Sequence, residues 1–386
     1  MMKIYFATRV RGFFKHLFAE PTIDAVISYS NNSIYELNNW KQRIVRIIAR
    51  KPIFDTLGLI RAINARNADC DVYGSFNRFL KADKPYFVYV ENPTALYHYR
   101  LDRGKSYLGH RKVCNMVNDS NLKHIVCMSQ ACKNTFEKLC CKLDDPSKLT
   151  QIYPLVPENP HVDKDMIIQR CHHDKEIKLL YIAQGIRFLS KGALEILKAF
   201  KDLKNNGYDE LSLTMVTSLS DISPDVLSEI SSVAGINLLD FNLSYEDMQQ
   251  LYASHNIFLM PTSDDSFNLT VLEAIKAGLP VIGSTLYAIP EMVKDSYNGY
   301  LTEPAYYFFD KECMPNPQVW NNRKETIYSG TCNERVAAFL YEKIEYLFKN
   351  REKLSELSIN SLNKANSAPF SRVHIVNQWN QILSDF

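Results

Sequence analysis

The sequence has little net charge, no long apolar run and no paired cysteine motif, and each absence excludes a class of protein. Its 386 residues include 45 Lys and Arg against 43 Asp and Glu, a formal net charge of +2 that argues against a chain built around a polyanion. No stretch approaches about 18 consecutive apolar residues, so no membrane-spanning helix is expected. The nine cysteines are scattered without a C-x-x-C pair, which favours reduced thiols in a cytoplasm.

Three further motifs are missing. The N-terminal residues lack the apolar run of a signal peptide, so the expected location is cytoplasmic, at most peripheral at the inner face of the membrane. No G-x-G-x-x-G follows a predicted strand, which disfavours a dehydrogenase. Neither Cys140-Cys141 nor Cys171-His172-His173 has a second ligand pair at zinc spacing, so we expect no metal and no cofactor.

The chain does contain the composition and patterning of a folded α/β protein. Hydrophobic residues make up 46% and charged residues 23%, and at roughly 150 residues per domain the length predicts at least two domains. Short apolar runs alternate with longer amphipathic stretches, as in strand–helix–strand units around parallel sheets. The clearest predicted strands are 72–76, 86–90 and 124–128 in the first half, and 177–183, 211–216, 236–239, 257–260 and 281–283 in the second.

The sequence predicts several helix ends and one linker between domains. Ser129 is a predicted N-cap, Ser244 with Asp247 has the form of a capping box, and Gly278 ends a helix over 269–277. Residues 333–349 have the apolar spacing of a long amphipathic helix. The proline-rich connector that follows residue 151 predicts a boundary, giving domains 1–157 and 158–365 and a C-terminal helix, 366–386, that packs back on the first domain.

Ligands of open α/β sheets bind beyond the carboxyl ends of the strands, so the turn after strand 177–183 is a candidate site. Gly185, Arg187 and Lys191 lie there within a few residues of a predicted helix start. Two cations beside helix N-terminal amides can neutralise a diphosphate. The alternative is an ordinary turn with exposed basic residues.

The turn after strand 257–260 carries two acids around the start of a helix. Asp265 lies just before the helix and Glu273 within its first two turns, and residues 267–270 present free backbone amides. The carboxylates can accept from sugar hydroxyls while the amides donate to phosphate oxygens. The alternative is that Asp265 caps the helix and Glu273 interacts with its dipole.

Residues 185–299 resemble the nucleotide-sugar-binding half of a family 4 glycosyltransferase. The resemblance implies a retaining enzyme of the GT-B fold, with two Rossmann-like doubly wound domains facing a central cleft. The motifs that carry the resemblance, in the family's order, are Gly185 with Lys191-Gly192, the Ser244 helix start, Pro261-Thr262-Ser263, the acidic-x7-Glu element ending at Glu273, Ala277-Gly278-Leu279-Pro280, and Pro290-Glu291 before Asn298-Gly299.

The resemblance implies a role for each candidate residue. Glu273 would bind the donor ribose and Asp265 the transferred sugar. The diphosphate and sugar would be bound by Gly185, Arg187, Lys191 and the amides of Phe267, Asn268, Leu269 and Thr270. With no convincing nucleophile, the implied reaction is front-face transfer of a hexose-type sugar from a UDP- or GDP-sugar, without metal, helix amides and cations stabilising the leaving diphosphate.

The sequence also departs from the family's pattern. The first acid is usually Glu, whereas here it is Asp265, and Tyr287-Ala288 replaces a glycine pair. In the first half, Glu91 stands where many members place a histidine; it either acts in catalysis or caps a helix. The family's glycine-rich first loop is missing, which leaves acceptor binding open. Residues 306–330 look like an aromatic-rich insertion that either shapes the acceptor cleft or packs outside it.

The small net charge conceals two halves of opposite sign. Residues 1–157 have 24 Lys and Arg and 13 Asp and Glu, a net of +11, and the remainder has a net of −9. The basic stretch 40–51 places isoleucines along one helical face, which fits either an anionic membrane surface or packing on its own sheet. The first reading implies a glycan or lipid-linked acceptor in cell-envelope polysaccharide synthesis, such as lipopolysaccharide.

Two other functions stay open from the sequence. A GT-B sugar-nucleotide epimerase would use the same donor site without an acceptor, although the order of motifs counts against it. A non-catalytic protein that binds nucleotide sugars or nucleic acid would leave Lys191, Asp265 and Glu273 unexplained, and nucleic acid binding would be sensitive to salt. We therefore expect no nucleic acid partner.

Overall fold

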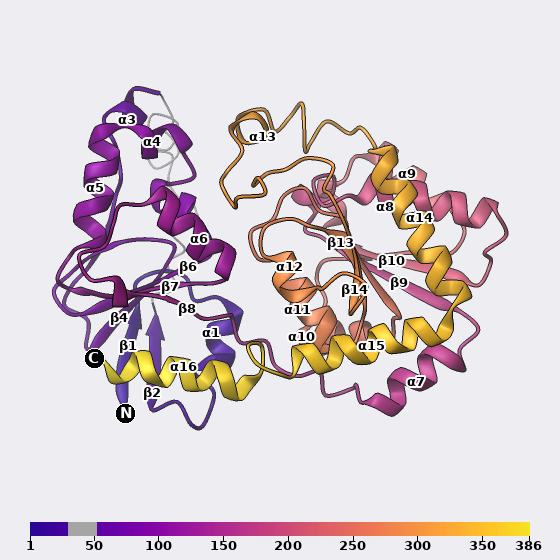
Figure 1. The fold of residues 1–386 in the computed structure, drawn as a ribbon, viewed down its shortest axis with the longest axis horizontal. Helices are drawn as coiled ribbons and strands as arrows, with labels where there is room; N and C mark the ends of the chain where they lie inside the picture. The colour runs from indigo at the N-terminus through magenta and orange to yellow at the C-terminus, as the bar shows by residue number, and fades with distance from the viewer. Residues whose placement is uncertain (30–51) are drawn as a thin grey trace. The chain divides into compact units, whose positions relative to one another are not determined.

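The computed structural model describes residues 1–29 and 52–386, and the chain divides into two compact units (Figure 1). Unit 1 consists of Met1–Leu155, Glu312–Pro315 and Pro369–Phe386, and unit 2 of Val156–Lys311 and Asn316–Ala368. The basic stretch 40–51 that sequence analysis singled out lies outside the described residues.

Unit 1 is built on a parallel sheet. Its strand order is β2-β1-β4-β6-β7-β8, so the chain runs to one edge and then crosses back to build the other side. The strands are β1 (Met2–Phe6), β2 (Ala25–Tyr29), β4 (Val72–Phe76), β6 (Tyr86–Val90), β7 (Leu122–Cys127) and β8 (Leu149–Gln151). A separate parallel pair is formed by β3 (Ile63–Ala65) and β5 (Leu80–Ala82).

One helix of unit 1 begins at a cap that the sequence predicts. The described helices of this unit are α1 (Gly12–Leu17), α3 (Pro52–Thr56), α4 (Leu101–Lys105), α5 (Tyr107–Val117), α6 (Gln130–Leu139) and α16 (Arg372–Ser384). Ser129 is the N-cap of α6, since its side chain accepts a hydrogen bond of 3.0 Å from the backbone N–H of Cys132. This confirms the predicted cap.

The C-terminal helix α16 supplies an aromatic anchor to unit 1. Figure 1 draws α16, in yellow, beside the strands of this unit. Trp379 is 1% exposed, and its ring centroid lies 5.4 Å from that of Phe87, 5.9 Å from that of Tyr89 and 6.0 Å from that of Phe14. These rings come from β6 and α1, so Trp379 ties the end of the chain to the sheet by burying aromatic surface.

Unit 2 repeats the architecture. Its parallel sheet has the order β11-β10-β9-β12-β13-β14. The strands are β9 (Ile177–Ile182), β10 (Leu211–Thr217), β11 (Ile236–Asp240), β12 (Ile257–Met260), β13 (Val281–Ser284) and β14 (Gly299–Thr302). Its helices are α7 (Lys164–His172), α8 (Ala193–Asn205), α9 (Pro224–Ser231), α10 (Tyr245–Ala253), α11 (Leu269–Lys276), α12 (Ile289–Met292), α13 (Pro317–Asn321), α14 (Glu334–Lys349) and α15 (Arg351–Ala365).

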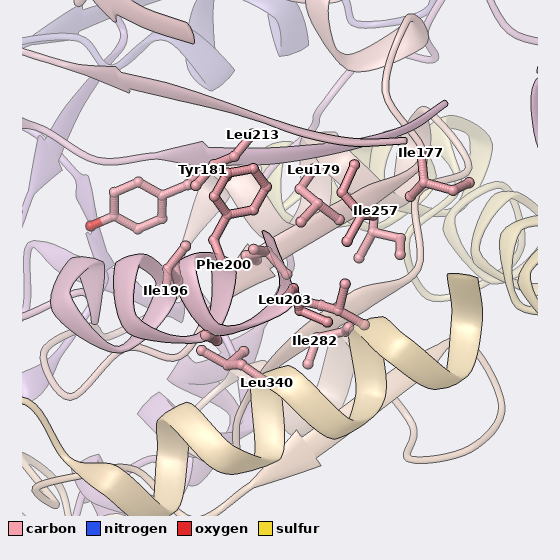
Figure 2. Close-up of a cluster of buried hydrophobic side chains, with 14 of the residues drawn as sticks. Ile177, Leu179, Tyr181, Ile196, Phe200, Leu203, Leu213, Ile257, Ile282 and Leu340 are labelled. Atoms are coloured by element: carbon pink, nitrogen blue, oxygen red, sulfur yellow. The ribbon is translucent and has the colours of Figure 1, made fainter. Parts of the chain in front are cut away.

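The core of unit 2 fills the space between the sheet and α8. Figure 2 shows Ile196, Phe200 and Leu203 of α8 beside strand residues such as Leu179 and Leu213, all of them 0% exposed. Because a parallel sheet is covered by helices, its strands are apolar throughout rather than alternating. This is why β9 and β12 were readable from the sequence as continuous apolar runs.

Two details of unit 2 test the sequence interpretation. The capping box of α10 is present, with the Ser244 hydroxyl accepting from the Asp247 backbone N–H and the Asp247 carboxylate accepting from the Ser244 backbone N–H. The expected count of five strands is wrong, because β14 adds a sixth. That strand begins with a glycine, which is depleted in strands, and its sequence GYLT is not a continuous apolar run.

We predict that Trp379→Ala destabilises unit 1 by about 3–5 kcal/mol, because it removes a buried aromatic ring and leaves a cavity. Val373→Ala on the same helix is the matched control, since Val373 is 69% exposed and its change should stay within about 0.5 kcal/mol. Urea unfolding followed by circular dichroism measures both. Equal unfolding midpoints for the two variants would contradict the anchoring role of Trp379.

Candidate active site

The strand order of unit 2 reverses between β9 and β12. From β9 the chain moves outward to β10 and β11, and then returns to β12 on the other side of β9. The loops that follow β9 and β12 therefore diverge at the carboxyl edge of the sheet, where open α/β sheets bind their ligands. Sequence analysis placed its main candidates on these two loops.

Glycine allows the first loop to approach its neighbours closely. A Cβ on Gly185 would lie 2.5 Å from the carbonyl oxygen of Ser218, in the loop after β10. Gly192, at the start of α8, has φ +83°, and a Cβ there would lie 2.6 Å from Pro261 at the end of β12. The two glycines therefore let three loops meet at one edge, and no side chain larger than hydrogen fits at either position.

An ion pair joins the two loops. Lys191 Nζ donates to Asp265 Oδ2 at 2.7 Å, and the two residues are only 9% and 7% exposed. Burial acts to raise the pKa of Asp265, but the charges of Lys191 and Arg187 and hydrogen bonds from Lys191 and Ser266 outweigh it, so this pKa lies below its ordinary value. Asp265 is therefore a carboxylate over the physiological pH range.

The start of α11 presents hydrogen-bond donors without partners. In the described chain, the backbone N–H groups of Leu269 and Thr270 donate to no protein acceptor, as is usual in the first turn of a helix. Phe267, which is 1% exposed, anchors this turn in the core. Asn268 has the left-handed backbone angles φ 68° and ψ 75°. The helix start is thus suited to an anion or a hydroxyl.

Glu273 lies one turn further along α11 and is hydrogen-bonded by a buried tyrosine. The Tyr252 hydroxyl of α10 donates to Glu273 Oε2 at 2.8 Å. Burial raises the pKa of Glu273 to about 7, although the Tyr252 hydrogen bond acts in the opposite direction. A carboxyl group that changes charge near neutrality, at the ligand-binding edge of a sheet, is typical of a functional site.

Glu91 lies in unit 1, directly after β6. Its backbone N–H donates to Asn77 Oδ1 at 2.8 Å, and its neighbour Asn92 caps the following 3-10 turn through a 2.8 Å hydrogen bond from the Thr94 backbone N–H. The alternative that Glu91 caps this turn is therefore wrong, because Asn92 occupies that position. Its catalytic role stays a prediction.

Asp264 and its partners were not predicted from the sequence. Asp264 is 4% exposed, and its Oδ2 accepts from the Ser190 hydroxyl at 3.4 Å and from the Tyr328 hydroxyl at 3.3 Å. Ser190 directly precedes Lys191, so this contact joins the same two loops beside the ion pair. No local signal could reveal Tyr328 as a partner, since it lies 64 residues from Asp264 along the chain.

Tyr328 belongs to the aromatic-rich segment 306–330, whose position the sequence left open. The backbone N–H of Tyr306 donates to the Ser263 hydroxyl at 3.0 Å, so the segment also contacts the loop after β12 at its other end. Between these points Arg323 lies 4.7 Å from the Trp320 ring centroid, a cation–π contact. In unit 2 the segment therefore contacts the loop after β12, which carries Asp265, through Tyr306 and Tyr328.

Neither a metal cluster nor a membrane helix appears in the part of the chain that the structure describes. Over 1–29 and 52–386, no three His, Cys, Asp or Glu side chains come together as a metal site, and no helix is both long and apolar enough to cross a bilayer. All nine cysteines are free thiols.

The fold is shared with solved structures that include a glycosyltransferase. The chain superposes on HepE from Anabaena, solved in complex with UDP-glucose, with a TM-score of 0.63 and 15% identity over 100% of both chains. At this identity the likeness shows the fold alone. It confirms the predicted fold class, α/β with two Rossmann-like domains of the GT-B kind.

Part of the second unit matches a family model. Residues 176–308 match the family model described as "Glycosyl transferases group 1". The GtfA subunit of a Streptococcus gordonii UDP-N-acetylglucosamine–peptide N-acetylglucosaminyltransferase is 30% identical over 142 residues, 36% of this chain and 23% of that protein. N-acetyl-alpha-D-glucosaminyl L-malate synthase from Bacillus anthracis is 34% identical over 111 residues, 26% of this chain and 28% of that protein.

The chain thus spans less than a third of the length of these two relatives. The resemblance drawn from the sequence over 185–299 is confirmed at the level of the group 1 domain. Membership of family 4 and a retaining mechanism stay predictions.

The raised pKa of Glu273 predicts a pH-dependent contribution to stability. Folding favours the protonated form, so the contribution is fully present below the ordinary pKa of Glu, near 4.5, and is lost as pH rises to about 7. Glu273→Gln does not titrate. We expect the unfolding free energy of the wild type, relative to this variant, to fall by roughly 1–3 kcal/mol between pH 4.5 and 8. Urea unfolding across this range measures the difference, and a constant difference would show that the pKa is not raised.

Proposed function

We propose that this protein is a glycosyltransferase that moves a sugar from a nucleotide-diphosphate sugar to an acceptor hydroxyl. One observation carries the proposal: the loops after β9 and β12 bring Lys191, Asp265, the free amides of α11 and the partly buried Glu273 to one edge of the unit 2 sheet. The match to the group 1 domain over the same residues supports it.

The diphosphate is assigned to the cations and the helix start. An ammonium group has three donors, and Asp265 takes one of those of Lys191, so others are available for phosphate oxygens. Arg187 lies close enough to Asp265 to lower its pKa, which places a second positive charge in the same region. With the amides of Leu269 and Thr270, these groups stabilise the charge that develops on the leaving diphosphate.

The two carboxyl groups are assigned to hydroxyls at the two ends of the donor. Glu273, held by Tyr252, accepts from the ribose hydroxyls, and Asp265 accepts from the transferred sugar with the acceptor capacity that Lys191 and Ser266 leave free. Since Asp265 is one methylene shorter than the glutamate usual in the family, the sugar would sit closer to the loop.

The finer assignment is a retaining, metal-independent transfer of a hexose-type sugar. The acceptor oxygen attacks the anomeric carbon on the face from which the diphosphate departs, so the new C–O bond replaces the old one on the same side. The proton of the acceptor hydroxyl passes to an oxygen of the leaving phosphate, and Glu91 of unit 1 would orient the acceptor. Activity that persists in EDTA, with an unchanged anomeric configuration in the product, is the expected result.

The acceptor is assigned to a glycan or lipid-linked sugar of the cell envelope. Unit 1 exposes apolar side chains beside bases: Ile53 is 61%, Leu57 51% and Tyr107 75% exposed, with the exposed Lys105 and Arg111 nearby in sequence. Segments 57–59 and 107–109 adjoin, since a Cβ on Gly58 would meet the backbone of Gly109 at 2.2 Å. A basic surface with apolar side chains fits an anionic membrane.

We predict that Glu273→Gln abolishes donor turnover without unfolding the protein, because the amide loses the charged acceptor for the ribose hydroxyls. A thermal-shift screen of UDP-, GDP-, ADP- and CMP-sugars should raise the melting temperature of the wild type with one of them, since a bound ligand stabilises the folded state. Turnover of that donor should fall at least about 100-fold in the variant, a loss of roughly 3 kcal/mol in transition-state binding.

Glu334→Gln is the matched control, because Glu334 is an exposed residue in the first turn of α14 in the same unit. It should keep wild-type turnover and the wild-type response to the donor. A fully active Glu273→Gln protein would refute the assignment of this residue to the donor.

Membrane binding is tested by flotation with vesicles that contain acidic lipid. The wild type should float at low salt and less at high salt, because the attraction to lipid headgroups is screened. Tyr107→Ser with Leu108→Ser should lose most of the binding, whereas Val373→Ser, on the exposed face of α16, should not. Flotation of the double variant equal to that of the wild type would refute this surface as the contact.

A further inference from the structure

Asn268 is held in an unusual backbone conformation at the start of α11. Its φ of 68° is in the left-handed region, which residues other than glycine seldom occupy, although asparagine tolerates it better than most. The residue is 4% exposed. Along the chain it lies between Asp265 and the free amides of Leu269 and Thr270, and its side chain is buried beside the Thr270 hydroxyl.

One end of the buried Asn268 carboxamide has no partner. Its Oδ1 accepts from the Thr270 hydroxyl at 2.6 Å, whereas its Nδ2 is buried without a hydrogen bond in the described structure. Turning the amide by 180° would let Nδ2 donate to the hydroxyl and would place the oxygen at the unpartnered position. In the orientation that the structure has, the buried Nδ2 donor is unsatisfied, which costs stability unless a ligand accepts from it.

The ligand group that satisfies both orientations is a hydroxyl, because it donates and accepts. A phosphate oxygen only accepts. In the proposed function it already has donors in Arg187, Lys191 and the amides of Leu269 and Thr270. We infer that the Asn268 carboxamide hydrogen-bonds a hydroxyl of the transferred sugar and contributes to the choice of sugar. This inference rests on the proposed function and names a side-chain contact in addition to the backbone amide that the family resemblance implies.

The test compares two ligands rather than one. Isothermal titration gives the dissociation constants of the donor found in the thermal-shift screen and of its nucleoside diphosphate without the sugar. Asn268→Gly keeps the left-handed backbone at no steric cost and removes the carboxamide. It should weaken donor binding about five- to tenfold, the range expected for one neutral hydrogen bond, and leave binding of the nucleoside diphosphate within about twofold.

Two further variants, Asn268→Asp and Asn67→Gly, serve as an intermediate case and a control for Asn268→Gly. The aspartate still accepts from a hydroxyl, so the ratio of the two dissociation constants should lie between those of the wild type and of Asn268→Gly. Asn67 has φ 63° on the surface of unit 1, so Asn67→Gly makes the same backbone change away from the site and should alter neither constant.

The outcomes distinguish a failure of the proposed glycosyltransferase function from a failure of the role assigned to Asn268. If the wild type binds no nucleotide sugar, the proposed function itself is wrong and the inference is lost with it. If the wild type binds a donor and Asn268→Gly binds it equally well, only the role of Asn268 is refuted. If the variant loses affinity for the nucleoside diphosphate as much as for the donor, the carboxamide contacts phosphate and the assignment to a sugar hydroxyl is refuted.

Discussion

The buried ion pair between Lys191 and Asp265 is the interaction on which the candidate site depends. It connects the loop after β9 to the loop after β12, on the two sides of the point where the strand order reverses. Removing either partner would leave an uncompensated charge in a buried environment, which typically costs several kcal/mol. Next to Lys191, Gly192 lets α8 begin in contact with Pro261, since a Cβ there would lie 2.6 Å from Pro261. The pair therefore holds Lys191 beside Asp265, which lies just before the start of α11.

Two residues near the same edge of the sheet have features that are unfavourable for stability. Glu273 is a carboxyl group whose burial moves its pKa to about 7, and Asn268 combines a left-handed backbone with an unsatisfied buried amide. A protein optimised only for stability would place apolar or fully bonded residues at these positions. Their concentration around the start of α11 is what favours this region as the candidate site. The contacts of Tyr328 and Tyr306 with this region show how the segment 306–330 supports it.

Much of the fold and part of the site were predictable because their signals are local. The strands β4, β6 and β12 have the predicted boundaries, and the caps at Ser129 and Ser244 follow from hydrogen bonds that span three residues. Lys191 and Asp265 were each selected as turn residues, but their pairing joins positions 74 residues apart. Likewise, Gly185 was selected for binding, whereas the structure adds a steric reason for glycine, its close approach to Ser218.

The sequence by itself therefore determined the alternation of strands and helices, the ends of a few strands, and the polar residues placed at those ends. Periodicity, caps and turn residues act within a few positions of the chain, so no tertiary information is needed to read them. Only the tertiary structure decided which turns meet, because the strand order depends on pairing between distant segments. It also decided that Tyr252 holds Glu273, that Tyr328 contacts Asp264, and that the Asn268 carboxamide is buried and incompletely bonded. Hydrogen bonding, burial and pKa shifts arise from neighbours in space, and the chain order does not specify those neighbours.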